Sequence, residues 1–227
     1  MEKDEETREE TGGKIRNGTA DGPPWERRER FGAVGGFGKT IVESSLRPTA
    51  FFRDLRRSGN LTDAALFGMG IAGITAFVES IWGFFFTPFW LAHGGAGGAP
   101  FAPLLAGWAF SWIKIVLAPI TMALLLLVVA GLIHGGLLVL GGAKRPFETT
   151  FRVVCYSTAP LLLSLIPCCG GPVGKVWAAA VCVIGLRECQ EATTGRGIAA
   201  VLLPAILMVG CLGLFAAAML TGVILHG

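Results

Sequence analysis

The sequence predicts an all-α integral membrane protein, a five-transmembrane-helix bundle that follows a disordered and amphipathic N-terminal cytosolic arm. The chain of 227 residues is 52% hydrophobic and only 15% charged, whereas soluble domains usually carry about 25% charged residues. Residues 1–60 hold 12 of the 19 basic and 11 of the 16 acidic residues. Too few charges remain in residues 61–227 to cover a soluble globule, and that region contains several apolar runs of membrane-spanning length.

Residues 1–40 are predicted to be a disordered, charged and glycine-rich cytosolic arm. Six acids crowd residues 1–13, and glycine and proline interrupt the sequence that follows. The start lacks the basic and apolar regions of a signal peptide, so the first apolar segment is expected to direct insertion. Residues 31–40 nearly match a phosphate-binding loop, but Ala33 replaces its first glycine and no buried strand precedes it. We therefore interpret residues 31–40 as a flexible linker.

Residues 41–60 are predicted to be an amphipathic juxtamembrane segment. Phenylalanine and leucine alternate with arginine, and Pro48 is expected to divide the segment into one or two short helices. Such helices would turn their apolar side chains toward lipid and their arginines toward headgroups. A docking site for a partner is the alternative. The residues expected at the membrane surface are Arg47, Phe51, Phe52, Arg53, Arg56 and Arg57.

Residues 61–227 are predicted to form the membrane domain, because each crossing needs about 20 apolar residues. The expected spans cover about 61–86, 104–140, 151–166, 173–190 and 198–225. The second run is long, and we expect one helix kinked at Pro119, since no polar turn residues lie near it. Whether residues 104–118 lie in the membrane or at its surface stays open.

The distribution of basic residues predicts the orientation. Lysine and arginine concentrate before the first span, between the second and third, and between the fourth and fifth. Because cytosolic loops carry this excess, the N-terminus is expected in the cytosol and the C-terminus outside. In a prokaryote this places the protein in the inner membrane. Cys168 and Cys169 would then face outward, with their oxidation state open.

Glu79, Lys114 and His134 are singled out as polar residues inside the first two predicted spans. Glu79 and Lys114 are expected at similar depth near the outer side, where they would neutralise each other, although a transporter would use Glu79 to bind a cation or proton. His134 lies near the cytosolic end of the second span. Without other ligands at its depth, we interpret His134 as a hydrogen-bonded bundle residue rather than a metal or proton site.

Enzyme signatures are missing from the sequence. It contains neither HExxH nor GxSxG, no aspartate follows Asp63, and the cysteines lack zinc-ligand spacing. We therefore predict no catalytic residue, no cofactor, no metal site and no nucleic-acid partner. The expected surroundings are the lipid bilayer, with a cytosolic protein as a further partner.

Two segments carry distinctive polar patterns. In residues 156–160, Pro160 deprives a helix of one N–H group, and Ser157 and Thr158 can supply replacement hydrogen bonds, so a kink is expected. Residues 185–196 are expected to leave the membrane on the cytosolic side, turn and re-enter. Thr193 or Thr194 would cap the next helix.

These patterns resemble the Yip domain family, multi-pass membrane proteins named for their interaction with Ypt/Rab GTPases. The resemblance covers roughly residues 60–225 and is most specific between 141 and 204. Residues 24–28 and 51–53 are similar to the arm of prokaryotic members. The residues that carry the family pattern are Tyr156, Pro160, Pro167, Gly185, Arg187, Glu188, Thr194, Gly195 and Arg196.

The resemblance implies five spans with a cytosolic N-terminus and, in eukaryotic members, membrane trafficking and binding of a small GTPase. We predict a non-enzymatic membrane protein that organises membrane or recruits a cytosolic partner. The alternative is a small-solute or ion transporter or channel that uses Glu79, Lys114 and His134. The oligomeric state stays open.

Overall fold

The computed structural model describes residues 22–55, 60–93, 101–167 and 169–226, and every regular element in these ranges is helical. The predicted all-α class is therefore confirmed for them. The elements are η1 (Pro24–Arg27), α2 (Arg28–Phe31), α3 (Ala33–Leu46), α4 (Pro48–Asp54), α5 (Leu61–His93), α6 (Phe101–Val139), α7 (Phe147–Tyr156), η2 (Ala159–Leu165), α8 (Gly170–Gln190) and α9 (Thr194–His226).

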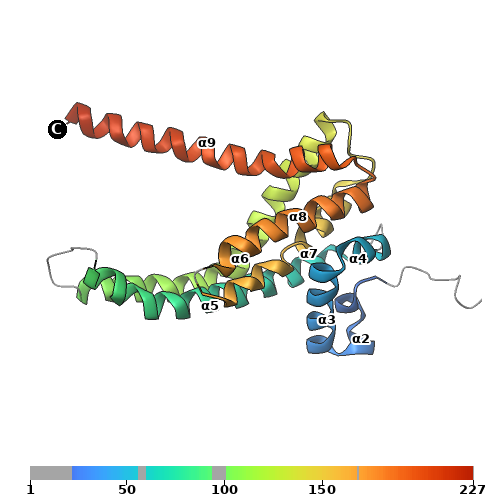
Figure 1. Cartoon of the computed structure of the whole chain (residues 1–227), viewed down its shortest axis with the longest axis horizontal. Coiled ribbons are helices and arrows are strands. Elements are labelled where there is room, and N and C mark those ends of the chain that lie inside the picture. The colour runs from blue at the N-terminus through green and yellow to red at the C-terminus, as the bar shows by residue number, and fades with distance from the viewer. Residues whose placement is uncertain (1–21, 56–59, 94–100, 168, 227) are drawn as a thin grey trace, which may run out of the picture.

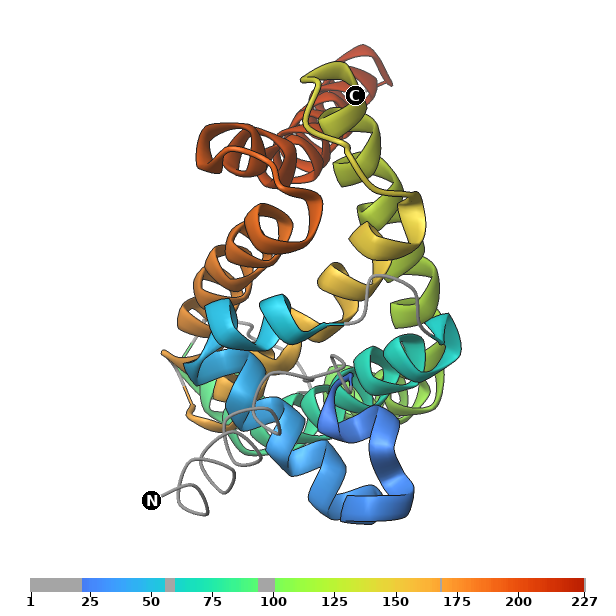
Figure 2. The same cartoon turned by 90° about the vertical axis from the view of Figure 1, so that its right-hand side faces the viewer.

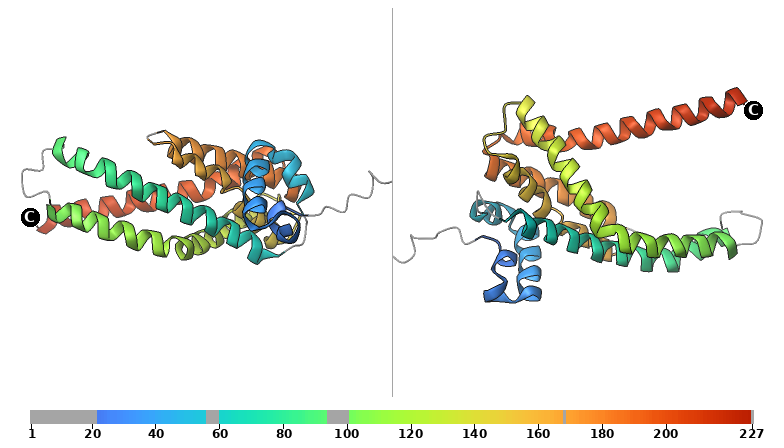
Figure 3. Two further views of the ribbon diagram at one scale, coloured as in Figure 1. Left: turned by 90° about the horizontal axis from the view of Figure 1, so that it is seen from below. Right: turned by 180° about the vertical axis from the view of Figure 1, so that it is seen from behind.

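Two helices have the length and composition of membrane spans. They are Leu61–Phe86 within α5 and Ile115–Val139 within α6. The first has the bounds of the predicted span 61–86, and the second covers the later part of the predicted span 104–140. As expected, α6 is a single helix with Pro119 inside it. Figure 3 shows its first part lying along α5 and its later part rising away. The described apolar part of α9, Thr194–Leu207, is shorter than a span.

The predicted single helix over residues 151–166 is wrong. α7 ends at Tyr156, and the 3-10 helix η2 begins at Ala159. Ser157 Oγ and Thr158 Oγ1 each donate a hydrogen bond of 2.7 Å to a backbone carbonyl of α7. Pro160 has no N–H with which to continue the α-helix. The segment is therefore two short helices joined by a turn, rather than one kinked helix.

The helices form an open bundle (Figure 1). α5 and the first part of α6 lie side by side, and α9 diverges from them along the opposite flank. The far ends of α5 and α9 point the same way, whereas α3 and α4 gather at the other end of the molecule, where α4 packs on α8. The buried core lies between these extremes, where α4, α5, α6, α7 and α8 meet.

The prediction of a disordered, flexible arm up to residue 40 is wrong over residues 24–40, which, apart from Gly32, lie in η1, α2 and the first part of α3. A Cβ atom at Gly36 would lie 2.8 Å from the Pro24 carbonyl oxygen. The Trp25 N–H donates to Thr40 Oγ1 at 2.9 Å. The glycine thus allows the backbones of η1 and α3 to pack closely, where the sequence had predicted a flexible linker. Residues 1–21 of the predicted arm lie outside the described residues.

The juxtamembrane segment breaks at Pro48 as predicted, because α3 ends at Leu46 and α4 begins at Pro48. Its aromatic residues, however, do not face lipid. Phe51 and Phe52 are only 6% and 1% exposed, and the Phe51 ring lies 5.5 Å from that of Tyr156. The apolar face of α4 therefore packs on the protein itself. Arg56 and Arg57 lie outside the described residues.

Candidate functional site

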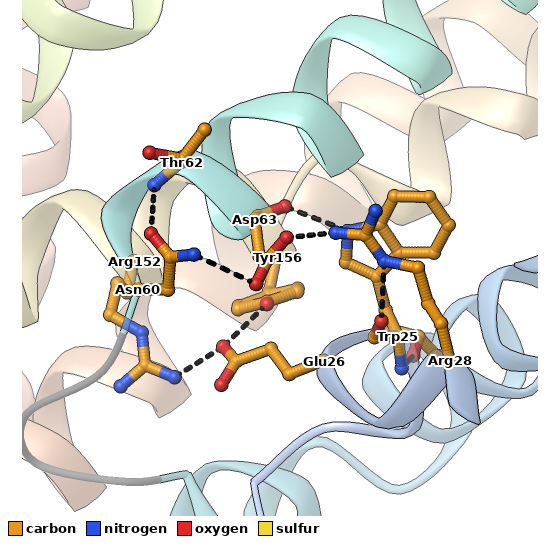
Figure 4. A network of polar contacts seen from close by, with 9 residues as sticks. Trp25, Glu26, Arg28, Asn60, Thr62, Asp63, Arg152 and Tyr156 are labelled. Atoms are coloured by element: carbon orange, nitrogen blue, oxygen red, sulfur yellow. Dashed lines mark hydrogen bonds and ion pairs between the residues drawn. The ribbon is translucent and has the colours of Figure 1, made fainter. Parts of the chain in front are cut away.

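A buried ion pair joins the N-terminal segment to α7 (Figure 4). Glu26 Oε1 accepts hydrogen bonds from Arg152 Nη2 at 2.5 Å and from the Tyr156 hydroxyl at 2.8 Å. The side chains of Arg152 and Glu26 are only 1% and 10% exposed. Arg152 and Tyr156 are four residues apart on one helix and therefore share a face. Each side chain supplies the other with a hydrogen-bonded partner at a position where a lone charge would be costly.

A second group of contacts ties the same segment to the start of α5. Trp25 Nε1 donates to the Asp63 carbonyl at 2.7 Å, and Arg28 pairs with the Asp63 carboxylate. The Arg28 guanidinium also lies 4.3 Å from the centre of the Trp25 ring, within the range of a cation–π contact. Asn60 Nδ2 donates to the other Asp63 oxygen at 3.1 Å. Residues 25–28 are thus fixed against both α7 and α5.

Sequence reasoning missed most of this network. Tyr156 was expected as a family-pattern residue, but Glu26, Arg152 and Asp63 were not singled out. The available signal was Arg152 itself, a lone charge within the run from Phe151 to Val154. A charge on a buried helix face needs a partner. Nothing in the sequence indicates that the partner lies 126 residues earlier.

A charged surface contact joins α4 to α8. Glu188 accepts hydrogen bonds from Arg53 Nε at 2.8 Å and from Arg187 Nη2 at 2.8 Å. These two contacts, with Arg53 first, hold the pKa of the Glu188 carboxyl below its ordinary value. The juxtamembrane arginine and the Arg187–Glu188 family pattern, predicted as separate features, therefore meet at one place. This contact fixes the end of α8 on the N-terminal helices.

Next to it, polar contacts join the α6–α7 loop to the end of α8. The Arg145 N–H donates to Gln190 Oε1 at 2.7 Å, and the Arg145 side chain pairs with Glu191 at 2.7 Å. Gln190 Nε2 donates to Thr150 Oγ1 at 2.8 Å, and His134 Nδ1 lies 2.9 Å from the same oxygen. His134 therefore lies within hydrogen-bond distance of Thr150, a partner of the kind expected for a bundle histidine.

The remaining family-pattern residues support turns and helix packing. Arg196 Nη1 donates to the Gly141 carbonyl at 2.9 Å, which ties α9 to the end of α6. Thr194 begins α9, and a Cβ atom at Gly195 would meet nothing within 4 Å. Pro160 is buried in η2. Pro167 follows the end of η2, in the connection to α8.

The structure gives no support for a transport site at the three intramembrane residues. The Glu79 side chain is exposed on α5, and the Lys114 side chain lies outside what the structure describes. Their ion pair therefore stays a prediction. His134 Nδ1 lies within hydrogen-bond distance of Thr150 Oγ1, and the centre of its ring lies 5.7 Å from that of Phe147. Among the described residues, no group of three or more His, Cys, Asp or Glu side chains is placed to hold a metal ion.

Comparison with known families identifies the domain. The family model of the Yip1 domain matches residues 42–217, from the middle of α3 into α9. No curated protein and no solved structure matches the chain. Arg152, Tyr156, Arg187 and Glu188 lie inside the matched region, whereas Glu26 precedes it. The matched region covers most of the chain, which therefore belongs to the Yip1 domain family.

Proposed function

We propose that this protein is a non-enzymatic, multi-pass membrane protein that recruits a cytosolic partner through a charged face. The proposal depends on one observation, which is that contacts made by charged residues join α4, the α6–α7 loop, the end of α8 and the start of α9 at one end of the molecule. The charged face consists of Arg53, Lys144, Arg145, Arg187, Glu188, Glu191 and Arg196.

The geometry of this face suits recognition. An arginine carries five N–H donors in a rigid fork. Arg53 donates to Glu188 from its Nε, yet its side chain remains 66% exposed, and that of Arg187 is 45% exposed. Both guanidinium groups are thus held in position while much of their surface faces solvent. Preorganised arginines of this kind are favourable at protein interfaces, because less side-chain freedom is lost on binding.

We further propose that the charged face lies in the cytosol, with five passages of the chain through the bilayer. The concentration of basic residues at this end supports that orientation. In this arrangement α5, α6 and α9 are the long crossings, and α7–η2 with α8 forms a shorter pair between them. The C-terminal end of α9, which points away from α3 and α4 (Figure 1), is then outside.

Family membership supports a protein partner. The Yip resemblance implies a small GTPase for a eukaryotic chain and a different cytosolic protein for a prokaryotic one. The charged face offers both signs, since Glu188 and Glu191 lie among the arginines. Mixed charge of this kind favours a partner with a complementary pattern over a uniformly acidic surface such as nucleic acid.

Charge reversal at the face tests the recruitment. In cells, a proximity-labelling enzyme fused before Met1 is expected to label a defined set of cytosolic proteins. In the double variant Arg53→Glu/Arg187→Glu, the labelling of at least one of these proteins is expected to fall severalfold. The introduced glutamates would repel Glu188 and the partner groups that bind the arginines.

The matched control is Arg30→Glu/Lys39→Glu, which makes the same change in net charge at exposed positions of α2 and α3. It is expected to leave the labelled set unchanged, and both variants must reach the membrane in equal amounts. An identical labelled set for the wild type and both variants would rule out recruitment by the charged face.

A further inference from the structure

A large apolar cavity lies between the helices of the membrane domain, separate from the charged face and from the Glu26 ion pair. Its volume is about 550 Å³, and its walls come from α6, α7, η2, α8 and α9. Figure 2, viewed from the end that carries α3 and α4, shows these helices around the middle of the molecule. Representative wall residues are Leu126 and Ile133 of α6, Leu161 of η2, Cys182 of α8, and Val201 and Pro204 of α9.

The walls suit a hydrocarbon rather than water. A buried water needs two to four polar partners. The hydroxyl groups in the walls belong to Ser157 and Thr158, and both already donate to backbone carbonyls. The volume falls within the range of about 300–1,000 Å³ that is usual for ligand pockets. An unfilled space of this size would forfeit the dispersion contacts of its walls, so an apolar occupant is favoured.

The surroundings of the cavity identify the occupant as a lipid chain. The α6 wall residues, from Met122 to Ile133, all lie within the candidate span Ile115–Val139. The cavity is therefore at the depth of the bilayer, where acyl chains are the available apolar molecules. The first α9 wall residue, Val201, follows Arg196 by five residues, which is about 7–8 Å along a helix.

Basic side chains lie at the end of the cavity nearest the charged face. Arg196 is exposed, and its Nη1 donates to the Gly141 carbonyl at the end of α6. Lys144, three residues after Gly141, is also exposed. Cations at this depth attract anionic headgroups. The order of features along α9, a cation followed by an apolar hollow, thus matches the order of headgroup and acyl chain in a phospholipid.

We propose that this cavity binds an anionic phospholipid, with an acyl chain between α6 and α9 and the phosphate beside Arg196 and Lys144. The acyl-chain part of the site is independent of the recruitment proposed above, because the apolar walls contain neither Arg53 nor Arg187. The headgroup part shares Lys144 and Arg196 with the charged face. In this arrangement, a bound lipid fills the space between α6 and α9.

Filling the cavity tests the acyl-chain part. Ala205 lines the cavity and is exposed, so Ala205→Trp places an indole in the space without meeting a packed neighbour. The full chain is reconstituted in nanodiscs of palmitoyl-oleoyl phosphatidylglycerol, extracted into mild detergent and weighed by native mass spectrometry. Wild-type protein is expected to retain a phosphatidylglycerol molecule, and Ala205→Trp to retain at least fivefold less.

The neighbouring Ile206 provides the control. It is 63% exposed and does not line the cavity, so Ile206→Trp is expected to retain lipid as the wild type does. Equal retention by Ala205→Trp and Ile206→Trp would overturn the proposal. A wild-type dimer that Ala205→Trp converts to a lipid-free monomer would also overturn it, because a second copy would then be the occupant.

A competition between two phospholipids with different headgroups tests the anionic part of the proposal. Phosphatidylglycerol and phosphatidylcholine with the same acyl chains are supplied in equal amounts, and the wild type is expected to retain mainly phosphatidylglycerol. Each basic residue near the surface contributes roughly a fivefold preference. Arg196→Gln and Lys144→Gln are therefore each expected to lower the preference by about that factor. An unchanged preference in the double variant would refute the anionic part.

Discussion

Replacing Arg152 by methionine is expected to lower the free energy of unfolding by about 3–5 kcal/mol, the usual cost of removing one partner of a buried ion pair. Methionine fills a similar volume but leaves the Glu26 carboxylate with the hydrogen bond from the Tyr156 hydroxyl and without its cationic partner. The Glu26 side chain is only 10% exposed, so water compensates poorly. Denaturant unfolding of the full chain in detergent micelles measures the effect.

Two companion variants make this result specific. Arg53→Met removes an arginine from an ion pair whose arginine side chain is 66% exposed, and exposed ion pairs contribute little to stability. Adding Glu26→Leu to Arg152→Met is expected to recover part of the loss, because an apolar pair can replace a buried ion pair. If Arg152→Met costs no more than Arg53→Met, the buried pair does not stabilise the docked N-terminal segment.

Replacing Gly185 by valine is expected to cost about 2–3 kcal/mol, near the upper end of the usual overpacking penalty. A Cβ atom at this position would lie 2.6 Å from Val153 Cγ1 and 3.0 Å from Phe52 Cζ. Both neighbours are buried, at 0% and 1% exposure, and cannot turn aside. The valine therefore separates α8 from α4 and α7, which thermal unfolding of the same micellar protein will detect.

Gly195 supplies the matched control for this variant. It also lies in a helix and in the family pattern, but a Cβ atom there would meet nothing within 4 Å. Gly195→Val is expected to change stability by less than about 0.5 kcal/mol, as is usual for exposed positions. Equal losses at Gly185 and Gly195 would show that steric contact with α4 and α7 is not the cause.

The sequence predicted α5 and α6 well because long apolar runs bounded by glycine, proline and charge have one simple solution, a helix across the membrane. The segment around Pro160 was harder. Hydropathy does not distinguish one continuous helix from two short helices joined by a turn, and the break depends on hydrogen bonds from Ser157 and Thr158 to the backbone. These contacts become visible only with the three-dimensional arrangement.

The N-terminal errors share one physical cause, which is that tertiary packing overrides local composition. Glycine-rich sequence predicted a linker, but Gly36 allows α3 to touch the Pro24 backbone. Amphipathic sequence predicted contact with lipid, but Phe51 and Phe52 satisfy the same apolar requirement inside the protein. The link between Glu26 and Arg152 spans 126 residues, and no local pattern encodes it.

The proposed recruitment depends most on the charged face lying in the cytosol and the end of α9 lying outside. A short fragment of a self-complementing fluorescent protein can be fused before Met1 or after Gly227, with its larger complement expressed only in the cytosol. We expect fluorescence from the fusion before Met1 and none from the fusion after Gly227, with both fusions present in the membrane. Fluorescence from both fusions would contradict an odd number of crossings and the orientation on which the proposed recruitment depends.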